Sequence, residues 1–311
     1  MSACFMFPGQ GSQKPGMGKD LADAFPAARA VFDEVDDALN EKLSTLIFEG
    51  PEDELTLTHN AQPALMAVSM AVLAALQTEK GVTVAASASH VAGHSLGEYS
   101  ALAAAGTFTL SDAASLLRLR GQAMQRAVPV GAGAMAALIG LDYDAAVDVA
   151  ENATQGEVCQ AANDNAPGQV VVSGHKAAVE RAVELAKDAG AQRAILLPVS
   201  APFHCALMQS AADEMAEALA GVAMNAPAVP LIANVTASAS SDPDTIRNQL
   251  ISQVTGTVRW RESVEALGGL GVDRLYEVGA GKVLCGLARR INRDMKASAI
   301  GTVADFDSID I

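Results

Sequence analysis

The sequence predicts an α/β protein whose main domain is interrupted by a smaller inserted subdomain. Two observations support this fold class. In the first third of the chain, short apolar runs that end in glycine turns are followed by longer runs of good helix formers. Further on, residues 128–199 contain short runs in the order strand, helix, strand, strand, helix, strand, with a proline near each end.

The N-terminal elements can be predicted individually. The apolar run 3–7 is broken by Pro-Gly-Gln-Gly, which indicates a buried strand that leads into a tight turn. Pro63 precedes an Ala-, Met- and Leu-rich run over 64–76, and because proline is favoured in the first helical turn, a buried helix is predicted to begin there. Residues 89–92, Gly93 and the helix formers of 96–105 predict a strand, a sharp turn and a helix.

The inserted subdomain is predicted to have the split βαβ, or ferredoxin-like, order. Its elements are a strand at 134–141, a helix that Asp142 caps and that runs to 152, strands at 158–162 and 170–173 on either side of a turn-rich connector at 163–168, a helix at 175–189 and a strand at 194–197. Hinges at 128–129 and 197–198 divide the chain into one discontinuous domain, residues 1–127 and 200–311, and a subdomain, residues 128–199.

Composition excludes several classes of protein. With 50% hydrophobic residues the chain is not disordered, and its 36 acidic against 21 basic residues, a net charge of −15, argue against a surface that binds nucleic acid. The four cysteines lack paired spacing, so no disulfide framework or metal site is expected. No uninterrupted apolar run reaches the roughly 20 residues of a membrane span, and no signal peptide is evident, so we expect a soluble, cytoplasmic protein.

A Gly-His-Ser-Leu-Gly segment at 93–97 matches the Gly-x-Ser-x-Gly pattern of serine nucleophiles. The flanking glycines allow a sharp turn that lifts the Ser95 hydroxyl above the sheet, and the amides that open the next helix can hold an oxyanion. The alternative is that Ser95 only caps that helix.

A serine nucleophile needs a base, and His204 is the first candidate among five histidines. It lies in the loop between the strand that leaves the insertion and the next helix, where α/β sheets place functional groups. The remaining histidines are interpreted as structural, solvated or loop residues: His59, His90, His94 and His175. The segment 279–282 lacks the spacing of a P-loop and is expected to be a turn into a helix that begins near Val283.

Five ordered segments resemble the malonyl-CoA:acyl carrier protein transacylases of bacterial fatty acid synthesis, in their stand-alone form. They are Phe-Pro-Gly-Gln-Gly-Ser-Gln at 7–13, Gly-His-Ser-Leu-Gly-Glu-Tyr at 93–99, Leu-Arg-Gly at 119–121, Phe-His-Cys-Ala-Leu-Met at 203–208 and Tyr-Glu-Val-Gly at 276–279. The similarity extends over essentially the whole chain. It implies an α/β-hydrolase-like core, with a parallel sheet, that carries an inserted ferredoxin-like subdomain.

The resemblance also implies roles for individual residues. Ser95 would be the acylated nucleophile and His204 its general base, oriented by the main-chain carbonyl of Gln253. Gln10 and the amide of Leu96 would form the oxyanion hole. Arg120 would bind the free carboxylate of malonate, whereas the residues alone do not distinguish it from a surface arginine.

Two further assignments concern specificity and docking. The bulky ring of Phe203, immediately before His204, resembles that of the malonyl-selective forms of related polyketide acyltransferases, which implies that it occupies the space a 2-methyl branch of the acyl group would need; the alternative is that it only fills the core. Arg289, Arg290, Arg293 and Lys296 continue the helical pattern that begins at Val283, and three of them would share one face. That face could receive coenzyme A phosphates or an acidic carrier protein, with Arg289 and Arg293 as the main contacts; equally, the cations could simply stabilise a helix C-terminus.

The expected activity is ping-pong transfer of a malonyl group from malonyl-CoA, through malonyl-serine, to the phosphopantetheine thiol of acyl carrier protein. No metal or other cofactor is expected, coenzyme A thioester being the substrate, and the protein is expected to be a monomer that binds neither nucleic acid nor membrane. Two alternatives remain at this point: a serine hydrolase on the same core, and a catalytically silent module that binds acyl carriers.

Overall fold

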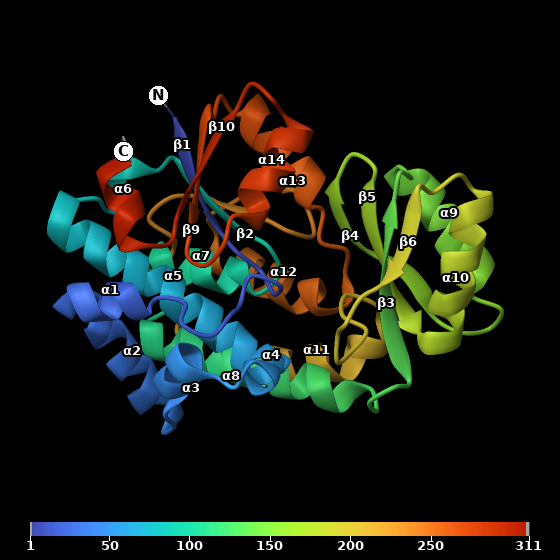
Figure 1. Ribbon diagram of the computed structural model, residues 1–311, viewed down its shortest axis with the longest axis horizontal. Helices are drawn as coiled ribbons and strands as arrows, with labels where there is room; N and C mark the ends of the chain where they lie inside the picture. Colours follow the sequence, from blue (N-terminus) through green and yellow to red (C-terminus); the bar gives the residue numbers. More distant parts are fainter. Residues whose placement is uncertain (1, 309–310) are drawn as a thin grey trace.

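The computed structural model describes residues 2–308 and 311, and it contains two separate β-sheets (Figure 1). The strands of the larger sheet are, in spatial order, β10 (Lys296–Ile300), β9 (Arg274–Val278), β1 (Ala3–Phe7), β2 (His90–Gly93), β7 (Leu231–Ala233) and β8 (Ser238–Ser240). Neighbouring strands pair in parallel except β7 and β8, which are antiparallel. The predicted α/β class with a largely parallel sheet is therefore confirmed.

Helices cover both faces of this sheet. One face carries α1 (Lys19–Ala24), α2 (Pro26–Leu39), α3 (Leu43–Glu49), α4 (Glu52–Thr56), α5 (Thr58–Lys80), α6 (Val84–Ser87), α7 (Gly97–Ala104), α8 (Leu110–Ala127), α11 (Gln209–Ala220) and α12 (Pro243–Thr255). The other carries α13 (Trp260–Gly269) and α14 (Val283–Ile291). Short 3₁₀ segments lie at Ala206–Met208 and Val303–Ser308.

Strand β1 shows why the sheet is buried on both sides. Phe5 and Phe7 belong to the core formed with α5 and α7, whereas Cys4 and Met6 belong to the core formed with α13 and α14. Because successive side chains point to opposite faces, a strand covered on both faces must be apolar at every position. The uninterrupted run 3–7 meets this requirement and places the following turn at the carboxyl edge of the sheet.

The smaller sheet lies to one side of the larger part and is entirely antiparallel (Figure 1). Its elements are, in chain order, β3 (Gly133–Ile139), α9 (Tyr143–Ala153), β4 (Cys159–Ala166), β5 (Gln169–His175), α10 (Lys176–Asp188) and β6 (Arg193–Leu196). The spatial order of the strands is β4-β5-β3-β6, and α9 and α10 pack on one face of the sheet through small apolar residues.

Helix α5 begins earlier than Pro63 predicts. It starts at Thr58, so that Pro63 lies inside it. Proline has no N–H for the carbonyl of residue 59, but Nη1 of Arg118 donates to that carbonyl of His59 at 2.8 Å. The helix is long and apolar enough to cross a membrane, yet 78% of its most apolar window is buried inside the protein, as in the core helix of a soluble protein.

The predicted connector at 163–168 is wrong for its first four residues. Residues 163–166 extend β4, and only Pro167 and Gly168 form the turn to β5. The strand accommodates these polar residues through two register shifts. Their side chains have partners outside the small sheet: Asp164 pairs with Arg261 and Asn165 with His94.

Candidate active site

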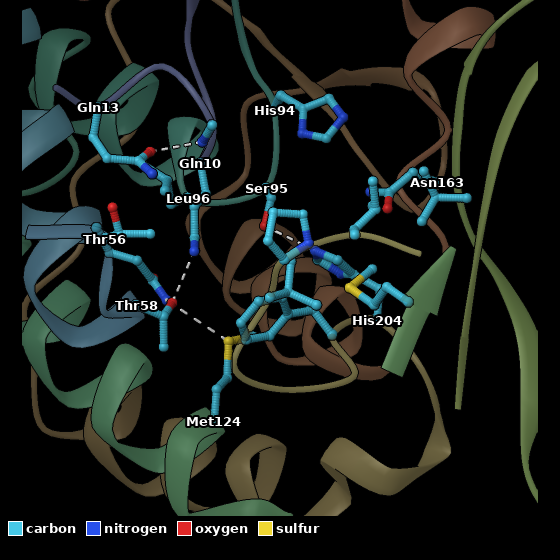
Figure 2. A pocket seen from close by; sticks show the side chains of 18 of the residues that line it. Gln10, Gln13, Thr56, Thr58, His94, Ser95, Leu96, Met124, Asn163 and His204 are labelled. Atoms are coloured by element: carbon cyan, nitrogen blue, oxygen red, sulfur yellow. Dashed lines mark hydrogen bonds between the residues drawn. The ribbon is translucent and has the colours of Figure 1, made fainter. Parts of the chain in front are cut away.

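The site lies at the carboxyl edge of the larger sheet, where the segments that follow three parallel strands meet. Gln10 follows β1, Ser95 follows β2 and Asn234 follows β7. A cavity of about 520 Å³ opens there, and residues of the small sheet, among them Met135 and Asn163, complete its wall. Figure 2 shows Ser95 and His204 facing one another within it. The edge at which parallel strands end is the usual place for ligands in α/β sheets.

Ser95 stands in a strained turn between β2 and α7. Its φ of 54° lies in the left-handed region, which a residue with a Cβ adopts only under constraint. The flanking glycines allow this conformation: a Cβ at Gly93 would lie 1.9 Å from the carbonyl of Gly97, and a Cβ at Gly97 would lie 2.2 Å from the carbonyl oxygen of Phe7. The strand, turn and helix predicted around Ser95 are all present.

His204 has the geometry of a general base. Its Nδ1 lies 2.8 Å from the main-chain oxygen of Gln253, and its Nε2 lies 2.8 Å from the Ser95 hydroxyl. A carbonyl can only accept, so Nδ1 carries the proton and Nε2 is free to accept one from Ser95. Burial lowers the pKa of His204 to about 3, and the positive charge of Arg120 contributes to this lowering, so the imidazole is neutral at neutral pH.

Arg120 is buried within α8, with only 1% of its surface exposed, and it points at the same hydroxyl. Its Nη2 donates to Oγ of Ser95 at 3.1 Å and to Oε1 of Gln253 at 2.7 Å, while Nη1 donates to Oε1 of Gln62 at 2.8 Å. The guanidinium also lies 5.6 Å from the ring centre of Tyr99. The interpretation of Arg120 as a surface arginine is therefore wrong.

Gln10 and Leu96 lie on the cavity wall beside Ser95 (Figure 2). Leu96 is the residue that precedes α7, so its backbone belongs to the positive end of that helix. The side chain of Gln10 accepts a hydrogen bond from the Thr58 hydroxyl at 3.0 Å, which fixes the turn after β1 against the start of α5. The oxyanion hole that these two residues would form stays a prediction.

A family model described as the acyl transferase domain matches residues 4–280. This chain belongs to the acyl transferase family. It is 48% identical over 308 residues to the malonyl CoA-acyl carrier protein transacylase of Bacillus subtilis, covering 99% of this chain and 95% of the relative. The resemblance noted in the sequence is thereby confirmed, and the chain is an acyltransferase of the malonyl CoA-acyl carrier protein transacylase type.

Solved structures of acyl transferases agree with this assignment. The acyl-carrier-protein S-malonyltransferase of Bartonella henselae superimposes with a TM-score of 0.96 at 60% identity, over 99% of this chain and 98% of that one. A malonyl-transacylase solved in complex with a type II PKS acyl-carrier protein gives a TM-score of 0.95 at 44% identity, over 99% and 98% of the two chains. The whole architecture, both sheets included, is thus that of known acyl transferases.

Phe203 lines the cavity, whereas the remaining histidines have different places in the fold. Phe203 is buried and lines the cavity next to His204. His94 lies against Trp260 and binds Asn165 through Nε2 at 2.8 Å, and Nδ1 of His175 accepts the amide of Val158 at 2.9 Å. The last two, His90 in β2 and His59 in the first turn of α5, belong to regular elements, so the loop expected around His59 is wrong.

The predicted basic helix face is wrong. Helix α14 ends at Ile291, because Asn292 adopts an extended conformation, and Lys296 is already the first residue of β10. Arg293 therefore lies in the connection between the two elements. Arg289 donates to the main-chain oxygen of Ala297 at 3.0 Å, and Arg290 to the side chain of Gln169 at 2.7 Å. These cations therefore do not form a stripe on one helix.

Sequence reasoning missed three buried polar residues that support the site: Gln62, Glu98 and Asn234. Asn234 accepts the amide of Ser95 at 2.8 Å and donates to the carbonyl of Gly93 at 2.7 Å, so it holds both sides of the strained turn. The available signals were weak. Asn234 directly follows a short buried strand, and Glu98 is part of the motif at 93–99, but neither position indicates its partners.

Proposed function

We propose that this acyl transferase moves a malonyl group from malonyl-CoA to the phosphopantetheine thiol of acyl carrier protein through a malonyl-serine intermediate, in ping-pong order. The observation that carries the proposal is the convergence of two groups on one hydroxyl. Oγ of Ser95 lies 2.8 Å from Nε2 of His204 and 3.1 Å from Nη2 of Arg120. A nucleophile, a base and a cation suited to a second carboxylate therefore meet at one end of the cavity.

In the first half-reaction, Nε2 of His204 takes the proton of Ser95 while Oγ attacks the thioester carbon. The carbonyl oxygen becomes an anion, which the amide of Leu96 and Gln10 stabilise. The carbon–sulfur bond then breaks, and the imidazolium returns its proton to the coenzyme A sulfur. The main-chain carbonyl of Gln253 stabilises the imidazolium and keeps the ring oriented, as a carboxylate does in other serine enzymes.

The second half-reaction reverses these steps with a different thiol. Nε2 takes the proton of the phosphopantetheine thiol, the sulfur attacks the ester carbon of malonyl-serine, and Ser95 leaves with the proton. A thiol of ordinary pKa near 8.5 is a good leaving group and a good nucleophile. A modest base therefore suffices in both directions, and the chemistry uses neither a metal nor a redox cofactor.

Arg120 selects the malonyl group in this proposal. A guanidinium binds a carboxylate with two parallel hydrogen bonds, and in a buried setting the pair is only weakly screened. The acyl group is then held at both ends, by Ser95 and by Arg120, which favours a dicarboxylic half-thioester over acetyl.

The partners and the remaining assignments follow the family. The complex of a related malonyl-transacylase with its acyl-carrier protein supports a carrier protein as the acceptor here. Arg289 and Arg293 are proposed as separate contacts for it, one in α14 and one in the connection that follows, because a local positive charge would attract an acidic carrier to a chain of net charge −15. We assign residues 1–127 and 200–311 to an α/β-hydrolase-like core and residues 128–199 to a ferredoxin-like subdomain, and we place the protein in the cytoplasm as a monomer.

The test of the proposed function is intact mass after mixing with malonyl-CoA. One malonyl adduct is expected on the protein, and it should disappear when phosphopantetheinylated carrier protein is added, with malonyl-carrier as the product. If free malonate appears instead and no malonyl-carrier forms, the protein is a hydrolase. If no adduct forms at all, the malonyl-serine intermediate is wrong.

Replacing Phe203 by serine is expected to increase methylmalonyl transfer relative to malonyl transfer. The ring lines the cavity beside His204, so its removal opens space for the 2-methyl branch. Because this space relieves the steric clash with the methyl group, the ratio of kcat/KM for methylmalonyl-CoA to kcat/KM for malonyl-CoA should rise by about tenfold or more. The ratio is measured with the two donors in competition. Phe203→Leu, which retains most of the bulk, is the matched control, and an unchanged ratio in Phe203→Ser would return Phe203 to the role of core filler.

A further inference from the structure

Glu98 is a buried carboxylate that the proposed reaction does not use. It lies in the first turn of α7, with 1% of its surface exposed, and it is not among the residues that line the cavity. Both of its oxygens accept hydrogen bonds: Oε1 accepts the amide of Asn234 at 3.1 Å, and Oε2 accepts Nε2 of Gln253. An acid that cannot reach substrate acts, if at all, through these two neighbours.

Gln253 connects this carboxylate to the arginine. Its Oε1 accepts Nη2 of Arg120 at 2.7 Å, while its Nε2 donates to Glu98 and, at 2.9 Å, to the main-chain oxygen of Ser95. Only one of the two possible orientations of the amide suits these partners, because a guanidinium needs an acceptor and a carboxylate needs a donor. The side chain of Gln253 thus lies between a buried cation and a buried anion.

Asn234 connects the same carboxylate to the nucleophile. The main-chain N–H of Asn234 donates to Glu98. Its side chain accepts the main-chain N–H of Ser95 and donates to the main-chain carbonyl of Gly93. The N–H and the C=O of Ser95 are therefore each held by a side chain, from Asn234 and from Gln253, and Glu98 holds both of those residues. One carboxylate anchors the supports of the hydroxyl and of the guanidinium.

We propose that Glu98 is a positioning residue for malonyl selection: as the buried counter-charge of Arg120, it orients that guanidinium through the amide of Gln253. The inference extends the proposed function and rests on it. A cation removed from water needs a nearby anion, and before substrate binds, Glu98 is the carboxylate that acts on Arg120. Burial raises the pKa of Glu98 to about 7, opposed by its two donors and by the charge of Arg120, so Glu98 supplies its full counter-charge above that pH.

Glu98→Gln tests this role because it replaces a carboxylate by a neutral amide of nearly the same shape. The carbonyl oxygen of the new side chain can still accept the fixed main-chain N–H of Asn234, so its NH₂ group faces the NH₂ group of Gln253. That conflict is relieved when the Gln253 amide turns over, which presents its NH₂ group to the guanidinium and displaces Arg120. We expect the kcat/KM for malonyl-CoA to fall about ten- to a hundredfold, mainly through KM.

Reactions that do not need Arg120 should lose less than malonyl loading in Glu98→Gln. The loading of Ser95 by acetyl-CoA, and its modification by an aryl sulfonyl fluoride, lose the Gln253 donor to the Ser95 carbonyl but no contact with a second carboxylate, so they should fall severalfold at most, and the ratio of malonyl to acetyl loading should fall. The matched control is Glu277→Gln. Glu277 is also fully buried and accepts two amides, those of Leu284 and Cys285, so this variant loses stability without changing the ratio of malonyl to acetyl loading.

A second variant reaches the same connection from its other end. Gln253→Met retains the main-chain carbonyl that binds His204 but removes the amide between Glu98 and Arg120, so it should lower malonyl loading relative to acetyl loading as Glu98→Gln does. An unchanged ratio in either folded variant overturns the role of Glu98. Failure of the unsubstituted protein to form a malonyl adduct would instead overturn the proposed function.

Discussion

Replacing His204 by alanine is expected to slow both half-reactions, the acylation of Ser95 by malonyl-CoA and the transfer to carrier protein, by about 10²–10⁴-fold. One nitrogen serves both steps: Nε2 lies 2.8 Å from the hydroxyl, and Nδ1 is committed to the carbonyl of Gln253. Because its pKa is lowered, the buried imidazole is neutral at neutral pH, and its Nε2 keeps a free lone pair directed at the hydroxyl. Rapid quenching followed by intact mass measures the two steps separately.

Two control variants define the interpretation of His204→Ala. Ser95→Ala should form no adduct, because the alanine has no atom that can be acylated. His175→Ala removes a histidine whose Nδ1 accepts the amide of Val158 in the small sheet, and it should leave both rates within about threefold of the unsubstituted protein. Slowing of only one half-reaction would contradict the assignment of His204 as the base of both.

Ser95 could be located from the sequence because its signal is local. The sharp turn between the strand and the helix has glycine on both sides of the serine: Gly93 lies close to Gly97, and Gly97 lies close to the carbonyl of Phe7. The elements of the small sheet likewise follow from short runs that alternate in sequence. Patterns of this kind depend on residues that are close together in the chain, so the sequence alone can predict them.

The supports of the site leave no such local signal. Arg120 donates to the side-chain amide of Gln253, 133 positions away. Asn234 accepts the main-chain N–H of Ser95, 139 positions away. Contacts between distant segments depend on how sheets and helices pack, which neither periodicity nor composition encodes. The resemblance to a family pointed to Arg120, but the buried polar network beneath Ser95 emerges only from the fold.

Errors in the predicted elements have the same origin. The helical spacing of Arg289, Arg290, Arg293 and Lys296 predicted one basic face, yet Lys296 instead pairs with β9 as the first residue of a strand. Residues 163–166 read as a turn because they are polar, but partners outside the small sheet, Arg261 and His94, allow them to remain in a strand. Tertiary contacts overrode local preference in both segments.

Replacing Arg120 by alanine is expected to lower the kcat/KM for malonyl-CoA by about 10²–10³-fold, because truncating one partner of a buried, hydrogen-bonded charge pair leaves the other charge without compensation. Arg120 is 1% exposed, and its guanidinium lies within hydrogen-bonding distance of Ser95. If the guanidinium is removed, little water can take its place beside the malonyl carboxylate. Acetyl loading should fall far less, since acetyl presents no second carboxylate.

The decisive quantity for Arg120→Ala is the ratio of malonyl to acetyl loading, measured with both donors on the same protein preparation. Arg118→Ala is the matched control. Arg118 lies two residues earlier on α8, is also buried and binds Glu41 at 2.6 Å, so its loss should lower stability while leaving the ratio unchanged. Equal losses of malonyl and acetyl loading in Arg120→Ala would show that the arginine supports Ser95 alone. A selective loss requires that its charge contacts the acyl group, because structural damage to the turn would slow both donors alike.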